Sequence, residues 1–236
     1  MPCNEMAREI WGWCIERQIW LTATHIPGKE NTVADKASRV FNDRTEWQLN
    51  QNLFKQITKV YGHPEIDMFA FRINFQMKPY MSWGPDPHAV AVNAFTLDWG
   101  KYFLYAFPPF SVISQVLQKV EQDQAETILV VPQWPTQAWY PKLLKLLIAN
   151  PILVPPDNNN LRLPFNPDKL HPLGGQLSLM ACRLSGRPSK VKEFHLQLKK
   201  LPSTLGGQAP KNNTRSTWKN GRDLQINGLQ IPFNHL

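Results

Sequence analysis

The chain has 236 residues, 42% of them hydrophobic and nine of them tryptophan, which is enough for one or two domains with a buried core. No apolar run approaches the roughly 18–20 residues that span a bilayer, and charged residues throughout residues 1–20 exclude a secretory signal peptide. We therefore expect no membrane partner. The three cysteines, Cys3, Cys14 and Cys182, have no metal-site spacing and predict an intracellular protein, with nucleus or cytoplasm and the oligomeric state left open.

The formal net charge of +8 is concentrated at one end of the chain. Residues 183–236 contain ten Lys and Arg against Glu193 and Asp223, whereas residues 1–182 are balanced. A basic segment of this kind neutralises phosphates without sequence preference. We therefore predict that residues 183–236 form an irregular, disordered linker that binds DNA or an RNA–DNA hybrid; a purely solubilising linker is the alternative. The candidate contact residues are Lys190, Lys192, Lys199, Lys200, Arg215 and Lys219.

The first 40 residues predict three elements in order. Apolar residues at helical spacing predict a helix over residues 6–18, and β-branched and aromatic residues predict a strand over residues 19–25. The turn at Pro27-Gly28 is followed by a short helix that Asn31 or Thr32 can cap.

Within this order, residues 25–35 read His-Ile-Pro-Gly-Lys-Glu-Asn-Thr-Val-Ala-Asp. This segment resembles the closing motif of the ribonuclease H domains of retroelement reverse transcriptases. The resemblance implies that Asp35 is a ligand of a two-Mg²⁺ site and that His25 assists proton movement or product release. Only 24 residues precede His25, too few for the other carboxylate ligands of such a site. We therefore expect residues 1–40 to be the C-terminal fragment of that domain, with His25 and Asp35 as relics.

After a polar connector, residues 50–61 predict a helix that stops at Gly62. A second α/β segment follows. Strands are predicted at residues 102–107 and 127–131, and Ser111 is predicted to cap the helix between them. This order predicts a βαβ unit with Pro108-Pro109 at the carboxyl end of its first strand, where α/β proteins bind ligands. One more helix is expected over residues 141–149, and residues 151–175 are expected to form an extended covering segment.

The second segment carries four short motifs. They are Asp67-Met68-Phe69-Ala70, the stretch from Asn93 to Trp99, Phe107-Pro108-Pro109-Phe110, and Val131-Pro132-Gln133-Trp134. Their order resembles that of phage-type adenine-N6 methyltransferases, and the whole stretch resembles the methyltransferase-like module of DIRS-like retroelements. The resemblance implies base stacking by Phe110, a carbonyl acceptor at Pro108, and an S-adenosylmethionine contact from Asp67. It also places Phe107 where active amino-methyltransferases have a polar acceptor.

The sequence thus predicts an α/β fold with three parts: an incomplete ribonuclease H-like piece (residues 1–40), a small methyltransferase-like domain (45–175) and a basic tail (183–236). Our first hypothesis is a truncated, retroelement-derived protein without independent catalysis, which binds no cofactor and retains nucleic-acid affinity. The alternatives are an S-adenosylmethionine-dependent DNA amino-methyltransferase and a host-adopted interaction protein.

Overall fold

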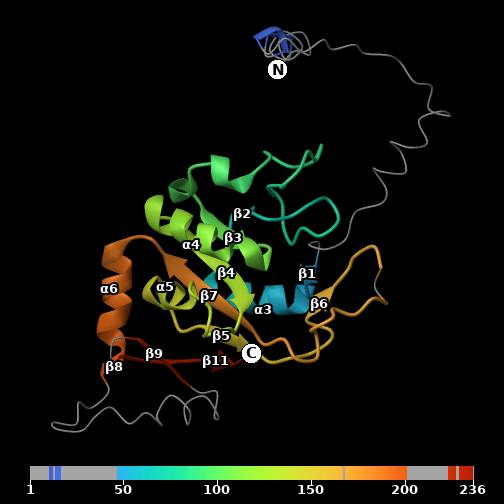
Figure 1. The fold of residues 1–236 in the computed structure, drawn as a ribbon. Coiled ribbons are helices and arrows are strands. Elements are labelled where there is room, and N and C mark those ends of the chain that lie inside the picture. Colours follow the sequence, from blue (N-terminus) through green and yellow to red (C-terminus); the bar gives the residue numbers. More distant parts are fainter. Residues whose placement is uncertain are drawn as a thin grey trace. The chain divides into compact units, whose positions relative to one another are not determined.

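The computed structural model describes residues 11–12, 14–16, 47–166, 168–200, 223–226 and 229–235 (Figure 1). The chain divides into two units, residues 1–44 and residues 45–236. In the first unit the described residues are helical, as predicted. The predicted strand over residues 19–25 and the candidate residues His25 and Asp35 lie outside the described residues.

Among the described residues of the second unit, six strands form a mixed sheet in the order β11-β5-β7-β4-β3-β2. Strands β2, β3 and β4 are parallel, β7 lies antiparallel between β4 and β5, and β11 is parallel to β5. The prediction of an α/β fold is confirmed at this level. The bounds are β2 (Ile66–Asp67), β3 (Phe103–Ala106), β4 (Glu126–Pro132), β5 (Ile152–Val154), β7 (Leu179–Ser185) and β11 (Asn234–His235).

The predicted βαβ unit is present as β3, α4 (Ile113–Gln122) and β4. Strand β3 ends before Pro108-Pro109 as expected, but the predicted cap at Ser111 is wrong. A 3₁₀ turn, η3 (Phe110–Val112), contains Ser111, and α4 begins without a side-chain cap. The cause is local: the Val112 N–H donates to the Pro109 carbonyl at 3.0 Å, so a tight turn closes before the helix starts. Two earlier 3₁₀ turns, η1 (Ala94–Thr96) and η2 (Trp99–Lys101), precede β3.

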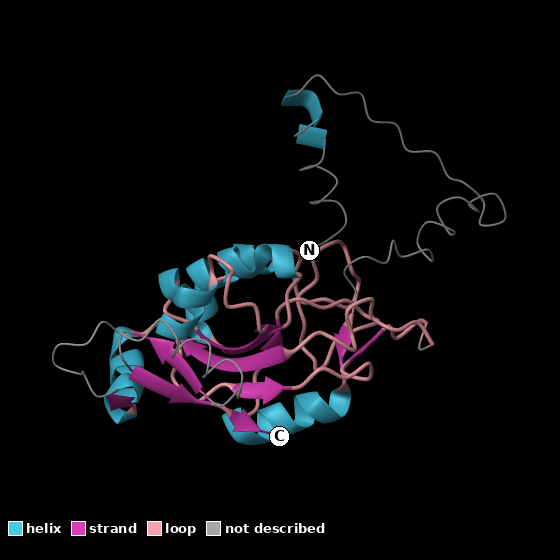
Figure 2. Ribbon diagram, turned by 60° about the horizontal axis from the view of Figure 1, so that its bottom comes forward, coloured by secondary structure: helices cyan, strands magenta, loops and turns pink. Residues whose placement is uncertain are grey.

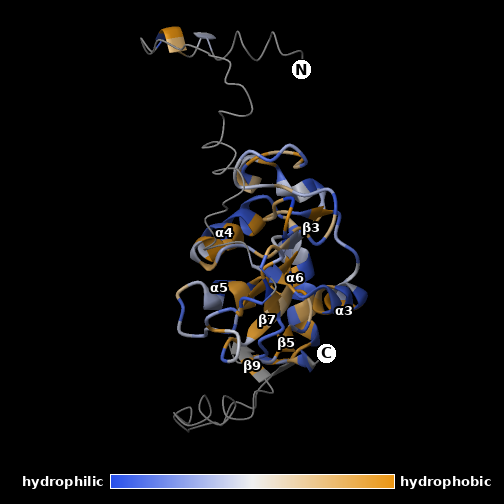
Figure 3. Cartoon of the chain, turned by 90° about the vertical axis from the view of Figure 1, so that its right-hand side faces the viewer, coloured by the Kyte–Doolittle hydropathy of each residue, from blue (hydrophilic) through white to orange (hydrophobic). Residues whose placement is uncertain are grey.

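Helices cover both faces of this sheet (Figure 2). Alternate residues of β4 point to opposite sides, Ile128 and Val130 towards α3 (Gln51–Tyr61), Leu129 and Val131 towards α4. The α4 side also carries α5 (Tyr140–Lys145) and α6 (Pro188–Gln197). Because both faces are buried, the central strands are continuously apolar, and hydrophobic residues concentrate in them (Figure 3).

Helix α3 matches its predicted range. The Asn50 side chain accepts a hydrogen bond from the Asn52 N–H at 2.8 Å, which caps the first turn. Gly62 ends the helix at φ +95°, a conformation that favours glycine. A short antiparallel pair, β1 (Gln48–Leu49) and β6 (Leu161–Arg162), lies beside this helix and forms part of the covering layer expected for residues 151–175.

The described part of residues 183–236 is not an irregular linker, which corrects the prediction. Strand β7 runs to Ser185 and α6 follows it. The strands β8 (Lys199–Lys200), β9 (Asp223–Ile226) and β10 (Leu229–Pro232) then form a small antiparallel sheet, and β11 joins the main sheet. The physical reason is that apolar residues lie between the charges: Phe194, Ile231 and Phe233 are buried in the main core. None of the helices in the described ranges is long and apolar enough to cross a membrane.

Candidate functional site

Two of the predicted motifs meet at one edge of the sheet. Strands β2 and β3 are parallel neighbours, with Asp67 opposite Tyr105, so their carboxyl ends lie side by side. Residues 68–71 continue from β2, and residues 107–110 continue from β3. This is the edge at which open α/β sheets bind ligands.

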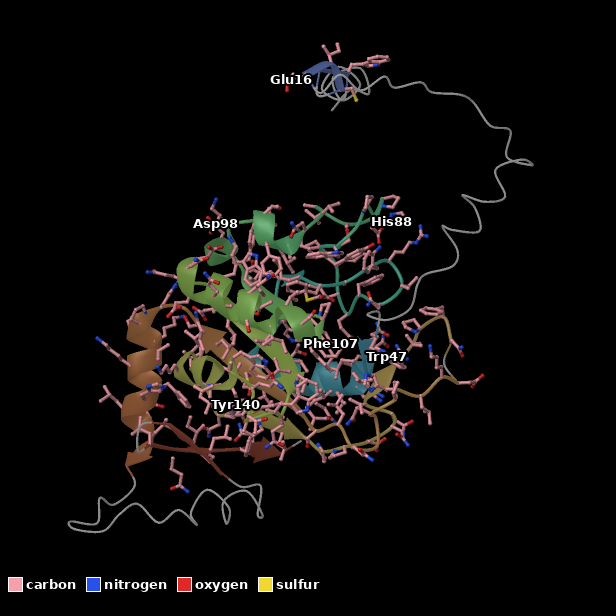
Figure 4. All side chains as sticks on the ribbon, in the orientation of Figure 1. Glu16, Trp47, His88, Asp98, Phe107 and Tyr140 are labelled. Atoms are coloured by element: carbon pink, nitrogen blue, oxygen red, sulfur yellow. The ribbon has the colours of Figure 1, made fainter. Side chains whose placement is uncertain are left out.

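An aromatic pocket with a volume of about 300 Å³ opens at this edge. All of its lining residues in the described part of the chain are uncharged, which suits an uncharged planar ligand rather than an ion. Trp83 is 60% exposed, so one wall of the pocket faces solvent. Figure 4 labels Phe107 and Trp47, two of the aromatic wall residues. The aromatic residues are Trp47, Phe69, Phe71, Trp83 and Phe107, and the others are Ala70, Asn74, Pro109, Ser111 and Val112.

Hydrogen bonds to backbone groups hold the aromatic walls in place. The Ala70 N–H donates to the Met81 carbonyl at 3.0 Å, and the Asn74 side chain accepts from the Phe71 N–H at 2.6 Å. The Ser82 hydroxyl donates to the Gly84 carbonyl at 2.6 Å and so closes the turn that carries Trp83. The pocket is therefore formed before any ligand arrives, which reduces the entropy cost of binding.

The Phe107–Phe110 motif divides between the pocket and the core. Phe107 and Pro109 line the pocket, and Pro108 is buried. Phe110 packs edge-on against Trp134, with ring centroids 5.3 Å apart, and contacts the cores on both sides of the sheet. The stacking position predicted for Phe110 thus lies outside this pocket, whose aromatic surface comes from Phe107 and Trp83 among others.

Asp67 lies at the end of β2, two residues before the first pocket residue of that segment, and is enclosed by protein. Its side chain is 2% exposed, and one carboxylate oxygen accepts a hydrogen bond from the Gln76 N–H at 2.9 Å. Burial raises the pKa of Asp67 to about 7, and hydrogen bonds from the backbone N–H groups of Gln76 and Phe69 offset only part of that rise. A carboxylate buried in this way does not fit the predicted contact with a hydroxyl of S-adenosylmethionine.

The predicted nucleic-acid contacts that the structure describes lie on α6 and on the short strand that follows it. Lys190 is ion-paired with Glu126, Lys192 is exposed on α6, and Lys199 and Lys200 form β8. Arg215 and Lys219 lie outside the described residues, as does the candidate Mg²⁺ ligand Asp35. Within the described ranges, no group of His, Cys, Asp or Glu is arranged to hold a metal ion.

Sequence reasoning missed most of the pocket. Phe69 lies in the motif Asp67–Ala70, but the resemblance implies no role for it. Trp47 and Trp83 lie outside the four motifs. Each lies in irregular structure, so no local periodicity marks it. The chain matches no model of a known protein family and no curated protein. The geometry of the pocket is therefore the observation that bears on function.

Proposed function

We propose that this chain is a retroelement-derived nucleic-acid-binding protein that holds an unpaired base in the aromatic pocket. The observation that carries the proposal is the set of five aromatic rings around a preformed pocket of about 300 Å³ at the carboxyl ends of β2 and β3. Aromatic rings accept any base, since every base presents a π face. The positive net charge of the chain supports the same partner, because nucleic acids are polyanions.

The retroelement origin is supported by the motifs themselves. Asp67–Ala70 and Phe107–Phe110 resemble segments of an adenine-N6 methyltransferase-like module, and both lie at the carboxyl ends of β2 and β3, where the aromatic pocket opens. A module that once acted on a base has a pocket of the right kind for binding one. Such a module can lose its catalytic groups and still bind a base if it keeps the aromatic residues of the pocket.

The pocket favours binding over methyl transfer. The side chain that should polarise the exocyclic amine is Phe107, which offers no hydrogen-bond acceptor. Asp67, the candidate for the cofactor hydroxyl, is enclosed by protein. Calorimetric titration with S-adenosylmethionine separates the two functions, because binding of that molecule would favour methyl transfer.

Replacing Trp83 with alanine should weaken binding of a single-stranded oligonucleotide by about 5- to 150-fold, equivalent to about 1–3 kcal/mol for one stacked base. Trp83 is 60% exposed, so its removal should leave the fold intact. Fluorescence anisotropy with a labelled oligonucleotide measures the affinity, and a thermal melt checks the fold.

Two variants serve as controls for Trp83→Ala. Trp83→Phe retains an aromatic face and should recover most of the affinity. Leu196→Ala removes an apolar side chain that is 87% exposed on α6 and does not line the pocket, so it should bind as the wild type does. Equal affinities for Trp83→Ala and Leu196→Ala would refute base binding in this pocket.

A further inference from the structure

A second recess, with a volume of about 300 Å³, lies where β3 begins, at the opposite end of that strand from the aromatic pocket. We call it the basic recess. The starts of β3 and β4, the second half of β7 and the turn before α6 all contribute to it. Its lining residues are Gly100, Lys101, Tyr102, Phe103, Glu126, Arg183 and Arg187.

Three cations surround a single carboxylate in the basic recess. Lys190 is hydrogen-bonded to Glu126. The nearest guanidinium nitrogens of Arg183 and Arg187 lie 3.7 and 3.8 Å from the Glu126 oxygens, too far for hydrogen bonds. Glu126 forms ion pairs with both arginines at these distances, so one negative charge faces three positive charges and the cluster keeps an excess of positive charge. Lys101 adds a fourth cation, which pairs with the exposed Asp98 at 3.4 Å.

The two arginines are held where a ligand can reach them. The Arg183 guanidinium lies 5.1 Å from the centroid of the Phe103 ring, and its side chain is 34% exposed. The Arg187 side chain is 46% exposed, and its backbone N–H donates to the Ser185 hydroxyl at 3.1 Å. Planar guanidinium groups with free N–H donors match the oxygens of a phosphate, often in pairs.

We propose that the basic recess binds backbone phosphates of a single-stranded nucleic acid, with Arg183 and Arg187 as the donors. This proposal rests on the proposed function for its choice of partner, since the aromatic pocket on the same strand takes a base. From Phe103 to Phe107 the chain advances about 13 Å at about 3.3 Å per residue. The two sites lie at opposite ends of β3, so one strand of nucleic acid that places a base in the pocket and phosphates in the basic recess must span at least this distance. An isolated phosphate ion would use only the basic recess.

An abasic oligodeoxyribonucleotide tests the basic recess separately from the aromatic pocket, because it has phosphates but no bases to stack. The probe is labelled with fluorescein and its affinity is measured by anisotropy over a series of salt concentrations. The double variant Arg183→Gln/Arg187→Gln should bind it roughly tenfold more weakly or worse. The slope of log K against log salt should decrease in magnitude by about 1.4, for two lost contacts to a single strand.

The matched control is Lys55→Gln/Lys59→Gln, which removes the same charge from exposed positions of α3. It should retain the wild-type salt slope. Equal loss in the two double variants, or no binding of the abasic strand by the wild type, overturns the proposal. Glu126→Gln provides a test in the opposite direction: it removes the only carboxylate among the recess-lining residues of the described chain and should tighten binding.

Thermal melts check that each variant is folded. If the double variant does not fold, Arg187→Gln alone replaces it.

Trp83→Ala shows which of the two proposals has failed. If it binds the abasic strand normally but loses affinity for a base-containing strand, base binding in the pocket holds whatever the arginines do. If Trp83→Ala keeps its affinity for both strands while the arginine variant loses affinity for both, phosphate binding in the basic recess is supported and base binding in the pocket is refuted. Inorganic phosphate that displaces the abasic strand at equal phosphate concentration would show a site for the free ion and overturn the strand assignment.

Discussion

Gly186→Ala should lower the free energy of unfolding by about 3–4 kcal/mol, through overpacking and one lost backbone hydrogen bond. Gly186 lies in the turn between β7 and α6, where a Cβ would stand 1.9 Å from the Val120 carbonyl oxygen and 2.8 Å from the Gln124 Cα. Both are backbone atoms, so no side chain can move aside. The turn must therefore separate from α4, which breaks the 2.9 Å hydrogen bond from the Gly186 N–H to the Ala125 carbonyl.

Urea denaturation of the full chain measures this loss, and Gly84→Ala is the matched control. A Cβ at Gly84 would meet its nearest neighbour, the Phe71 ring, at 3.9 Å, an ordinary contact. That substitution should change stability by no more than about 0.5 kcal/mol. The same turn carries Arg187 towards the basic recess, so Gly186→Ala should weaken abasic-strand binding as well. A stability loss equal to that of Gly84→Ala would contradict the close packing between this turn and α4.

Elements with a local pattern were predicted well from the sequence. Helix α3 follows its apolar spacing and ends at Gly62, and the unit β3–α4–β4 follows from two apolar runs with Pro108-Pro109 between them. In each case the residues that determine the element are close in sequence, and steric rules for proline and glycine mark its end.

Elements that depend on distant partners were not predicted. Strand β7 is apolar from Leu179 to Cys182, but the shift in charge composition at Arg183 suggested that the folded domain ends before it. Its pairing with β4, in which Leu129 lies opposite Cys182, joins residues far apart in the chain. The β11–β5 pair is a similar long-range contact. Composition reports average polarity and does not reveal which strand edge is free to accept another strand.

The candidate site also contains one part that a local sequence pattern indicates and other parts that form only in the tertiary structure. The sequence indicated the carboxyl end of β3, because a strand followed by Pro108-Pro109 has a recognisable pattern, and the aromatic pocket opens there. Trp47 and Trp83 reach the pocket from irregular segments, and the cations of the basic recess meet at Glu126 only after β4 and β7 pair. Such groupings arise from tertiary structure, so no short motif contains them.

The free energy of unfolding should fall by about 3 kcal/mol between pH 4 and pH 7, and by about 4 kcal/mol over the whole titration, because of Asp67 alone. Its pKa is raised by burial from an ordinary 3.8 to about 7 in the folded protein. Between these values the folded chain keeps a proton that the unfolded chain has released, so stability decreases as pH rises. Below the ordinary pKa both states are protonated, and above about 7 both are ionised, so the loss is then complete. Each unit of pKa difference corresponds to about 1.4 kcal/mol.

Asp67→Asn should remove this pH dependence while keeping an oxygen that can accept the Gln76 N–H. Urea denaturation at several pH values between 4 and 8 should show a flatter profile for Asp67→Asn, and at pH 8 the variant should be at least as stable as the wild type. Glu65→Gln is the matched control, because Glu65 is an exposed acid next to β2. Parallel profiles for the wild type and Asp67→Asn would contradict a buried, proton-binding Asp67. A flattened profile for Asp67→Asn alone would assign the proton to the Asp67 carboxyl group, on the strand whose Asp67 carbonyl accepts from the Met81 N–H at 2.7 Å.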